Sequence, residues 1–187
     1  MLNVAAIALR GFLLIFGAVV LGLSVTLAKQ QVIGNPPSET SFNSFVGAFG
    51  ILVSGLAVLN ILIDRVPKVG VMAADALASV LYLAGAIALT IALKNVSSCT
   101  SNSNEARGER YANKLLNGGC RKTKDGPDCP NVGGSTQKDI GKYTGPRCQK
   151  VQADYVFGYL GFLLGAASVL MTFLAHRRGG ATHASVV

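Results

Sequence analysis

The sequence predicts an all-α protein, built as a bundle of four transmembrane helices, from its composition and from four long apolar runs. The chain of 187 residues is 50% hydrophobic and only 14% charged, with a mean hydropathy of +0.45. This composition excludes a disordered chain and argues against an ordinary soluble domain. A hydrocarbon core of about 30 Å takes roughly 20 apolar residues at the helical rise, and each run is close to that length or longer. The runs occupy residues 11–28, 42–63, 71–93 and 155–175.

The runs account for nearly half of the chain, so we expect a single domain over residues 1–187. The segments between them are too short or too polar to form a second core. The expected spans are residues 7–28, 42–63, 71–93 and 152–175, with a loop at 94–150 and a tail at 176–187. A cleaved signal peptide is the alternative for the first run, but its apolar stretch exceeds the usual length of roughly 7–15 residues. Its one basic residue, Arg10, also follows a largely apolar stretch instead of forming a charged leader.

Basic residues in the short segments predict the orientation of the chain. The loop at 94–150 carries 11 Lys and Arg against 5 acidic residues. However, its length approaches the limit of about 60 residues beyond which charge no longer decides which side a loop takes. Among the short segments, those expected on one side of the membrane carry only Lys29. Those expected on the other side carry Arg10, Arg65, Lys68, Arg177 and Arg178. We therefore expect both termini in the cytosol, and residues 29–41 and 94–150 outside.

All the cysteines of the chain, Cys99, Cys120, Cys129 and Cys148, fall in the loop at 94–150. An even set confined to one polar loop is typical of an oxidising compartment. A metal site in a reduced loop is the alternative, but the loop has no C-x-x-C pair and no histidine. Of the three possible pairings we favour Cys99–Cys148, which would join neighbouring ends of the third and fourth spans. The remaining pair, Cys120–Cys129, would then close a small hairpin.

The rest of this loop is rich in Gly, Asn, Ser, Lys and Thr, which predicts irregular structure. One short helix is expected over residues 105–116, with Asn104 as its cap. The sequence Asn95-Val96-Ser97 is a glycosylation acceptor motif. Because it abuts the predicted membrane surface, we expect it to remain unmodified.

Two charged residues stand out inside the predicted spans. An acid at the centre of a transmembrane helix costs about 2.5–3.5 kcal/mol on insertion scales, and such residues are candidates for function. Asp75 lies about one turn inside the third span, and Arg10 lies at a similar depth in the first. We expect the two side chains to pair between these helices. The alternative is that each extends separately to the headgroups at its own helix end.

Small residues in the fourth span predict close helix packing. Gly158, Gly161 and Gly165 are spaced so that two backbones can approach each other, and the last two form a GxxxG motif. Packing within one bundle is the simpler interpretation, and a dimer face is the alternative.

Enzyme motifs are absent from the sequence. It contains no H-E-x-x-H, no G-x-S-x-G and no Walker-type loop. Its two histidines, His176 and His183, lie in the tail, and Glu39, Asp64 and Asp154 lie at span boundaries without visible catalytic partners. We therefore expect no catalytic, cofactor-binding or metal site, and no nucleic-acid partner.

Several residues in and beside the first, third and fourth spans carry a family resemblance. They are Leu9-Arg10, Asp75, Cys99, Arg147-Cys148, Gln152-Ala153, Phe157 and Tyr159. In order and spacing the chain resembles the fungal MARVEL-domain proteins of the non-classical export protein 2 type. Its enlarged loop, with the extra cysteines Cys120 and Cys129, departs from that pattern.

The resemblance implies a non-enzymatic, multi-pass protein of the plasma membrane that organises lateral domains such as eisosomes. It also implies a response to sphingolipids and a link to unconventional secretion. Expected partners are membrane lipids, with sphingolipid-rich or sterol-rich domains foremost, other membrane or eisosome proteins, and further copies of the chain. From the residues alone, a small channel or transporter that uses Asp75 is the rival hypothesis.

Overall fold

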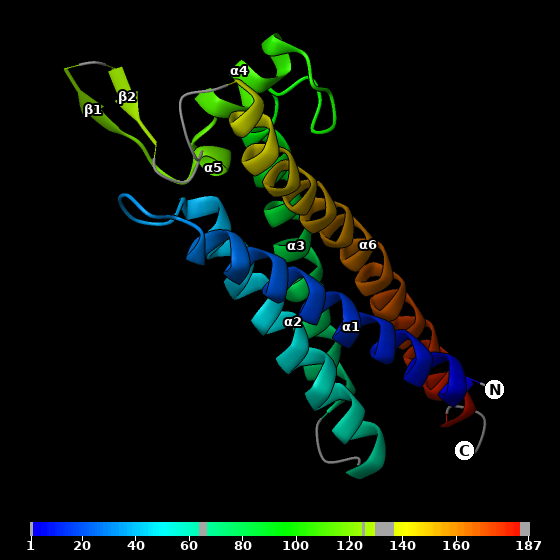
Figure 1. The fold of residues 1–187 in the computed structure, drawn as a ribbon. Coiled ribbons are helices and arrows are strands. Elements are labelled where there is room, and N and C mark those ends of the chain that lie inside the picture. Colours follow the sequence, from blue (N-terminus) through cyan, green and yellow to red (C-terminus); the bar gives the residue numbers. More distant parts are fainter. Residues whose placement is uncertain (1, 64–66, 125, 130–136, 184–187) are drawn as a thin grey trace.

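The computed structural model describes residues 2–63, 67–124, 126–129 and 137–183, and it shows a bundle of four long helices (Figure 1). They are α1 (Leu2–Lys29), α2 (Ser38–Ile63), α3 (Lys68–Ala92) and α6 (Gln137–His183). α1 packs mainly on α2, and α3 mainly on α6, while contacts of α1 with α6 and of α2 with α3 close the ring. Each helix contains a segment long and apolar enough to cross a membrane. These segments are Ala6–Lys29, Ser38–Asn60, Val69–Ala92 and Ile140–Leu174.

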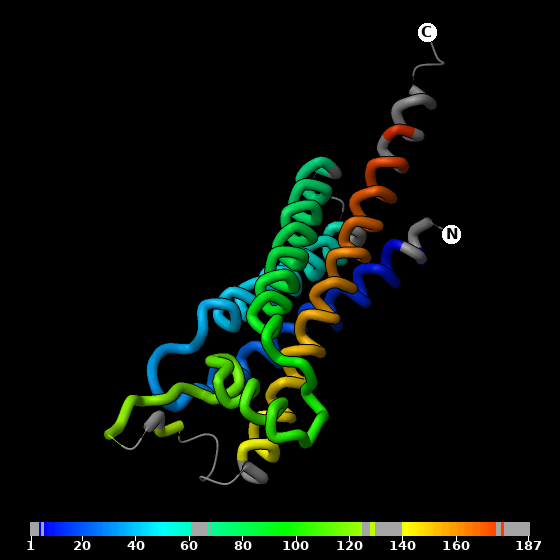
Figure 2. The backbone as a smooth tube through the Cα atoms, turned by 90° about the horizontal axis from the view of Figure 1, so that it is seen from above, coloured from blue at the N-terminus to red at the C-terminus, as the bar shows by residue number. Residues whose placement is uncertain are grey.

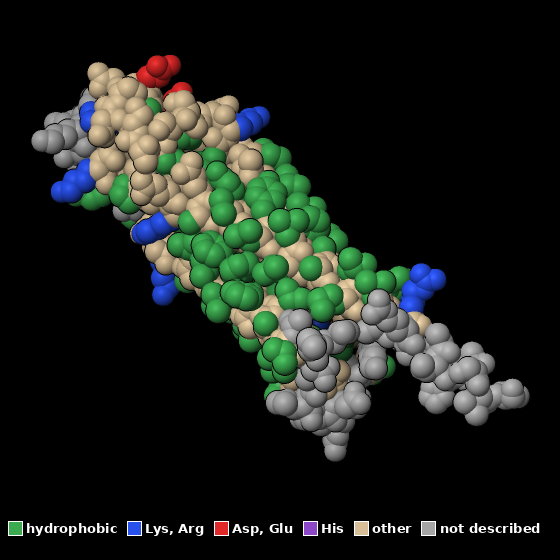
Figure 3. Space-filling model, turned by 90° about the vertical axis from the view of Figure 1, so that its right-hand side faces the viewer, with side chains coloured by type: hydrophobic (Ala, Val, Ile, Leu, Met, Phe, Trp, Pro, Cys, Tyr) green, Lys and Arg blue, Asp and Glu red, His purple; other side chains and the backbone are tan. Residues whose placement is uncertain are grey.

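Buried positions recur at alternating steps of three and four residues, the spacing of helices that wrap around one another with a small crossing angle. On α1 these positions are Arg10, Leu13, Gly17, Val20, Ser24 and Leu27. On α6 they are Val151, Asp154, Gly158, Gly161, Gly165 and Ser168. Eight of these twelve residues are polar, charged or glycine. Outside, hydrophobic side chains cover the flank of the bundle (Figure 3). The interior is therefore no more apolar than the surface, as expected of helices that face lipid.

The described part of residues 94–150, which we call the headpiece, lies at the end of the bundle opposite the first turns of α1 and the last turns of α6 (Figures 1 and 2). It contains α4 (Asn104–Ala112), α5 (Lys114–Asn117), β1 (Arg121–Thr123), β2 (Gly126–Asp128) and the first turns of α6. The two strands form an antiparallel hairpin with Lys122 opposite Pro127. This hairpin lies between Cys120 and Cys129, which are joined by a disulfide.

The hairpin is tied at its base to the connection between α1 and α2. The backbone N–H of Val32 donates to the carbonyl of Gly118 over 2.8 Å. Gly119 follows with a positive φ of 92°, and a Cβ there would collide with the carbonyl oxygen of Ile33. A side chain is excluded at this position both by the backbone conformation and by the close approach.

The predicted helix at 105–116 is wrong in its cap and its length. Helix α4 begins at Asn104, and the side chain of Ser103 caps it by accepting from the N–H of Ala106. The chain leaves the helix at Asn113, whose extended backbone starts α5. Asn113 breaks the helix because its side chain has two other roles: it accepts from the N–H of Leu115 and donates to the carbonyl of Ala92. Short Asn side chains favour such local backbone contacts over helix interiors.

Helix α6 starts before the predicted fourth span, inside the segment that the sequence predicts to be irregular. Helix α6 begins at Gln137, fifteen residues before the expected span, so part of the loop is helical and Cys148 lies within a helix. Pro146 is exposed and leaves the helix unbroken. Hydropathy misses these turns because their exposed face is polar. Their helical period is visible only in the buried residues Ile140, Thr144, Arg147, Cys148 and Val151.

Candidate functional site

The guanidinium of Arg10 on α1 contacts the carboxylate of Asp75 on α3 in the half of the bundle that lies away from the headpiece. Nη1 donates to Oδ1, and Nη2 donates to Oδ2 over 2.6 Å. The hydroxyl of Ser168 on α6 lies 3.5 Å from the same Oδ2. Arg10 is 5% exposed and Asp75 2% exposed, so the structure places the two predicted residues in direct contact, away from solvent.

This paired arrangement leaves neither carboxylate oxygen of Asp75 without a donor. A buried bidentate pair is geometrically specific, because the planar guanidinium matches both oxygens at once. It links α1 to α3, two helices that lie across the ring from each other. The pair therefore sets the rotation and the depth of both helices relative to the bundle axis.

Tyr82 on α3 occupies the centre of the bundle, and glycines on the other three helices make room for it. A Cβ on Gly17 of α1 would lie 3.0 Å from the Tyr82 hydroxyl, and one on Gly161 of α6 would lie 3.0 Å from its ring. A Cβ on Gly50 of α2 would overlap the hydroxyl oxygen itself. Tyr82 is 2% exposed, and its hydroxyl has no hydrogen-bond partner among the described residues.

The three glycines predicted to pack helices all face α3 of the same chain. Gly158 lies against Ala86, Gly161 against Tyr82, and Gly165 against Ser79. They are buried, so they form part of the bundle interior in this structure. Close approach of α3 and α6 depends on the absence of side chains at these positions.

We expect Gly50→Ala to destabilise the bundle by about 1–3 kcal/mol, the usual cost of an added methyl group in a packed core. The added carbon would meet the Tyr82 hydroxyl. Thermal unfolding in detergent, followed by circular dichroism, measures the effect. Gly55→Ala is the matched control, because nothing lies within 4 Å of that Cβ on the same helix. Tyr82→Phe should restore part of the stability of the Gly50→Ala variant, because it removes the atom closest to the added carbon while the ring carbons Cζ and Cε2 stay 2.7 and 2.9 Å away. No recovery at all would contradict the proposed collision.

A second buried acid is Asp154, which the sequence places at a span boundary without a visible catalytic partner. In the structure it lies on α6 with 0% exposure, and the hydroxyl of Ser24 on α1 donates to its Oδ2. Its other oxygen, Oδ1, has no hydrogen-bond partner among the described residues. Ser24 follows Arg10 by two heptads on the same face of α1, and this spacing is the signal that could have located the contact.

We expect Ser24→Ala to cost about 1–3 kcal/mol, because it removes the hydrogen bond to a buried carboxyl group that has no other described donor. Asp154→Asn is the matched variant: it keeps an oxygen for Ser24, and a neutral amide is less costly to bury than a charge. We expect it to be at least as stable as the parent chain. Chemical unfolding in micelles compares the two, and an unchanged Ser24→Ala would contradict the structural role of this bond.

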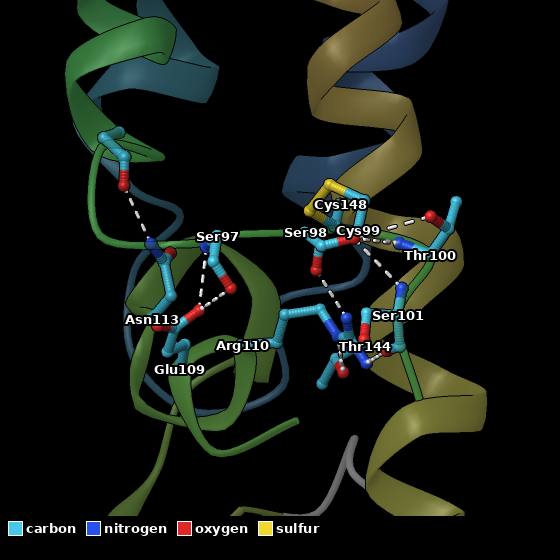
Figure 4. The surroundings of a disulfide bond; sticks show 11 residues. Ser97, Ser98, Cys99, Thr100, Ser101, Glu109, Arg110, Asn113, Thr144 and Cys148 are labelled. Atoms are coloured by element: carbon cyan, nitrogen blue, oxygen red, sulfur yellow. Dashed lines mark hydrogen bonds between the residues drawn. A yellow bond between two sulfur atoms is a disulfide. The ribbon is translucent and has the colours of Figure 1, made fainter. Parts of the chain in front are cut away.

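The Cys99–Cys148 disulfide is buried where α3, the headpiece and α6 meet (Figure 4). Arg110 of α4 donates hydrogen bonds to two backbone carbonyls beside Cys99. Nη1 donates to the carbonyl of Ser98 over 2.6 Å, and Nη2 donates to that of Ser101 over 2.9 Å. Its Nε donates to the hydroxyl of Thr144 on α6. Arg110 is 1% exposed. Because its partners lie on both sides of the disulfide, it holds together the two chain segments that the disulfide joins. Sequence reasoning did not predict this role.

Electrostatics in the headpiece follow from these contacts. Burial lowers the pKa of Arg110, and the neighbouring Arg107 lowers it further, although a guanidinium remains charged at neutral pH. Beside it, Glu109 accepts from both the hydroxyl and the N–H of Ser97, and these bonds lower the pKa of Glu109. Because the folded pKa lies below the unfolded value, this contact stabilises the headpiece at neutral pH and is lost on acidification.

Arg147 of α6 connects the headpiece to the end of α1. Nη1 donates to the carbonyl of Gln30 over 3.2 Å, and Nη2 to that of Leu115 over 3.3 Å. Arg147 is 5% exposed. Together with Asn113, which bonds the last turn of α3, it fixes the headpiece to three helix ends.

The part of the chain that the structure describes shows no cluster of metal-ligating side chains. No three His, Cys, Asp or Glu side chains gather there into a group that could hold a metal ion. The candidate site is instead structural: a buried ion pair and a buried acid that set the helix positions, beneath a disulfide-bonded headpiece.

Comparison with known families accounts for this architecture. One family model, described as the membrane-associating domain MARVEL, matches residues 4–171. The chain belongs to the MARVEL family. Comparison with curated proteins and with solved structures found no match. The MARVEL match covers the first three apolar segments, the fourth as far as residue 171, the headpiece and both members of each disulfide. The protein is thus a multi-pass membrane protein of a membrane-associating family, and this family is not an enzymatic one.

Proposed function

We propose that this MARVEL protein is a non-enzymatic organiser of lateral domains in the plasma membrane, like the fungal proteins of the non-classical export protein 2 type. In this proposal both termini are cytosolic, the headpiece is outside, and the protein takes part in eisosome assembly, in the response to sphingolipids and in unconventional secretion. Two disulfides in the headpiece support the orientation, because disulfides persist in oxidising compartments.

The observation that carries the proposal is the state of Asp75. Both of its carboxylate oxygens receive hydrogen bonds from Arg10, and the side chain is 2% exposed. A channel or transporter would need an intramembrane acid that its substrate can reach. The charges of Arg10 and Asp75 bind each other and hold α1 to α3. This pairing favours an organiser over the rival channel.

Large apolar side chains on the outside of the helices support a role in lipid contact. Leu52 and Leu56 on α2, Val80 on α3 and Leu163 on α6 are each more than half exposed. Glycines let the helix backbones pack closely, and the length of the apolar segments can select lipids of matching thickness. Partners in this proposal are sphingolipid-rich or sterol-rich lipid, eisosome proteins and further copies of the chain.

Fluorescence imaging of the tagged full-length chain in living cells tests this function. Immobile patches at the cell edge, slow bleaching recovery and dispersal after inhibition of sphingolipid synthesis are the expected results. Asp75→Asn should disperse the patches because the bundle loses its register, whereas Gly22→Ala, an addition into open space on α1, should leave them intact. A uniform, freely diffusing signal from the parent chain would overturn the proposal, as would an ion flux that Asp75→Asn abolishes.

A further inference from the structure

Lysines mark the headpiece ends of three of the four membrane-spanning helices. Lys29 is the last residue of α1, Lys94 follows α3 by two residues, and Lys150 lies on α6. Lys29 and Lys94 are exposed, and Lys150 is half-buried. Three hydrophobic residues close to them, Leu27, Leu93 and Val151, belong to one buried cluster.

This shared cluster places the three lysines at one level along the bundle. Lys94 and Lys150 each adjoin a member of the cluster, and Lys29 is two residues from another. Hydrogen bonds across the same level agree: Arg147 bonds the carbonyl of Gln30, next to Lys29, and Asn113 bonds that of Ala92, two residues before Lys94. The apolar segments of α1 and α3 end here, whereas the one on α6 begins ten residues before Lys150, at Ile140. The uncharged run of α6 starts only after Asp154. We therefore infer that lipid headgroups meet the protein at this level.

Negative charge near this level is already occupied or buried. Glu39, at the start of α2, lies 3.4 Å from Lys114 in an ion pair. Asp154 is 0% exposed inside the bundle. Among the described residues, the ion pairs do not involve Lys29, Lys94 or Lys150. Figure 3 shows basic side chains toward both ends of the hydrophobic flank.

We propose that Lys29, Lys94 and Lys150 form a belt that recruits lipids with an anionic phosphate headgroup into the leaflet on the headpiece side. A lysine near the membrane surface attracts an anionic lipid by about 1 kcal/mol, and three at one level act together. The ammonium is a compact point charge that requires no fixed ligand geometry. The lipid backbone can therefore be glycerol-based or sphingoid-based. This inference deepens the proposed function by naming the lipid chemistry that an organiser would gather.

Spin-label electron paramagnetic resonance on the purified full-length protein in phosphatidylcholine bilayers tests the belt. The probes are spin-labelled phosphatidic acid and ceramide phosphate, with spin-labelled phosphatidylcholine as the reference. We expect both anionic probes to associate with the protein more strongly than the reference. Lys29→Gln, Lys94→Gln and Lys150→Gln together should lower this selectivity at least about threefold.

The matched control removes the same charge from the headpiece at a distance from the belt: Lys122→Gln, Lys124→Gln and Lys142→Gln, all at exposed positions. We expect selectivity to persist in this control, and equal losses in the two triple variants would overturn the belt. Selectivity that follows the lipid backbone instead of the headgroup charge would do the same.

Salt provides a test on the parent chain that does not depend on any variant folding. Exposed charges are screened over about 3 Å at 1 M ionic strength, so selectivity should fall sharply in 1 M NaCl. Selectivity that resists salt would overturn the inference. If the parent chain shows no lipid selectivity in bilayers but forms patches in cells, only this inference is refuted. If it shows selectivity in bilayers but a diffuse signal in cells, only the proposed function is refuted.

Discussion

Asp75→Asn should destabilise the protein by about 3–5 kcal/mol, because removal of one member of a buried ion pair leaves the other charge uncompensated. Arg10 is 5% exposed and carries a guanidinium cation, so the variant must bury an unpaired cation or move α1. Ser168 can offer only a hydroxyl at this point. Reversible unfolding of the full chain in mixed micelles measures the loss.

A double-mutant cycle separates the pair from its two members. The double variant Arg10→Met with Asp75→Leu should recover most of the stability, because apolar residues of similar volume can replace a buried pair at little cost. Coupling of several kcal/mol between the two positions is the expected result. If the single losses simply add in the double variant, the side chains do not act as a pair and the contact between α1 and α3 has another origin.

Removal of the Cys99–Cys148 disulfide, as Cys99→Ser with Cys148→Ser, should cost about 4 kcal/mol by the loop-closure relation. The bond closes a sequence separation of 49 residues. Its loss would also free the segment around Ser98 and Ser101, to which Arg110 is bonded. We therefore expect faster hydrogen exchange in α4 and in the first turns of α6, together with a lower unfolding temperature.

The second disulfide provides the comparison. Cys120–Cys129 closes a separation of only 9 residues, for which the same relation gives about 2.5 kcal/mol. Because the hairpin has little core of its own, Cys120→Ser with Cys129→Ser should increase exchange in β1 and β2 and leave the four helices intact. Equal effects of the two double variants on the bundle would contradict the separate roles of the disulfides.

The four membrane-spanning helices could be predicted from the sequence because hydropathy is a local property. A run of about 20 apolar residues has few stable alternatives to a helix in lipid, since every backbone group must be hydrogen-bonded within the segment. Arg10 and Asp75 were visible for the same reason, as charges inside apolar runs. Their depths matched, and the structure places them in contact.

Other contacts could not be predicted, because they join polar residues whose neighbours are decided by packing. Asp154 resembled a boundary residue, and only the rotation of α6 against α1 places it on Ser24. In the sequence, Arg110 is one of many cations in a basic loop. Only the orientation of α4 directs its side chain toward the carbonyls beside Cys99. Tyr82 resembled an ordinary residue of a transmembrane helix, yet it fills the space left by glycines on three other helices.

The sequence by itself determined that the chain crosses a membrane four times, that its cysteines lie in one polar segment and that two charges are placed at matching depths. These properties follow from composition along the chain. Only the tertiary structure decided that α6 extends into the headpiece, that the glycines of α6 face α3, and that three lysines share one level. Such relations depend on helix rotation and depth, which are set by the simultaneous packing of all four helices and are not encoded in any single segment.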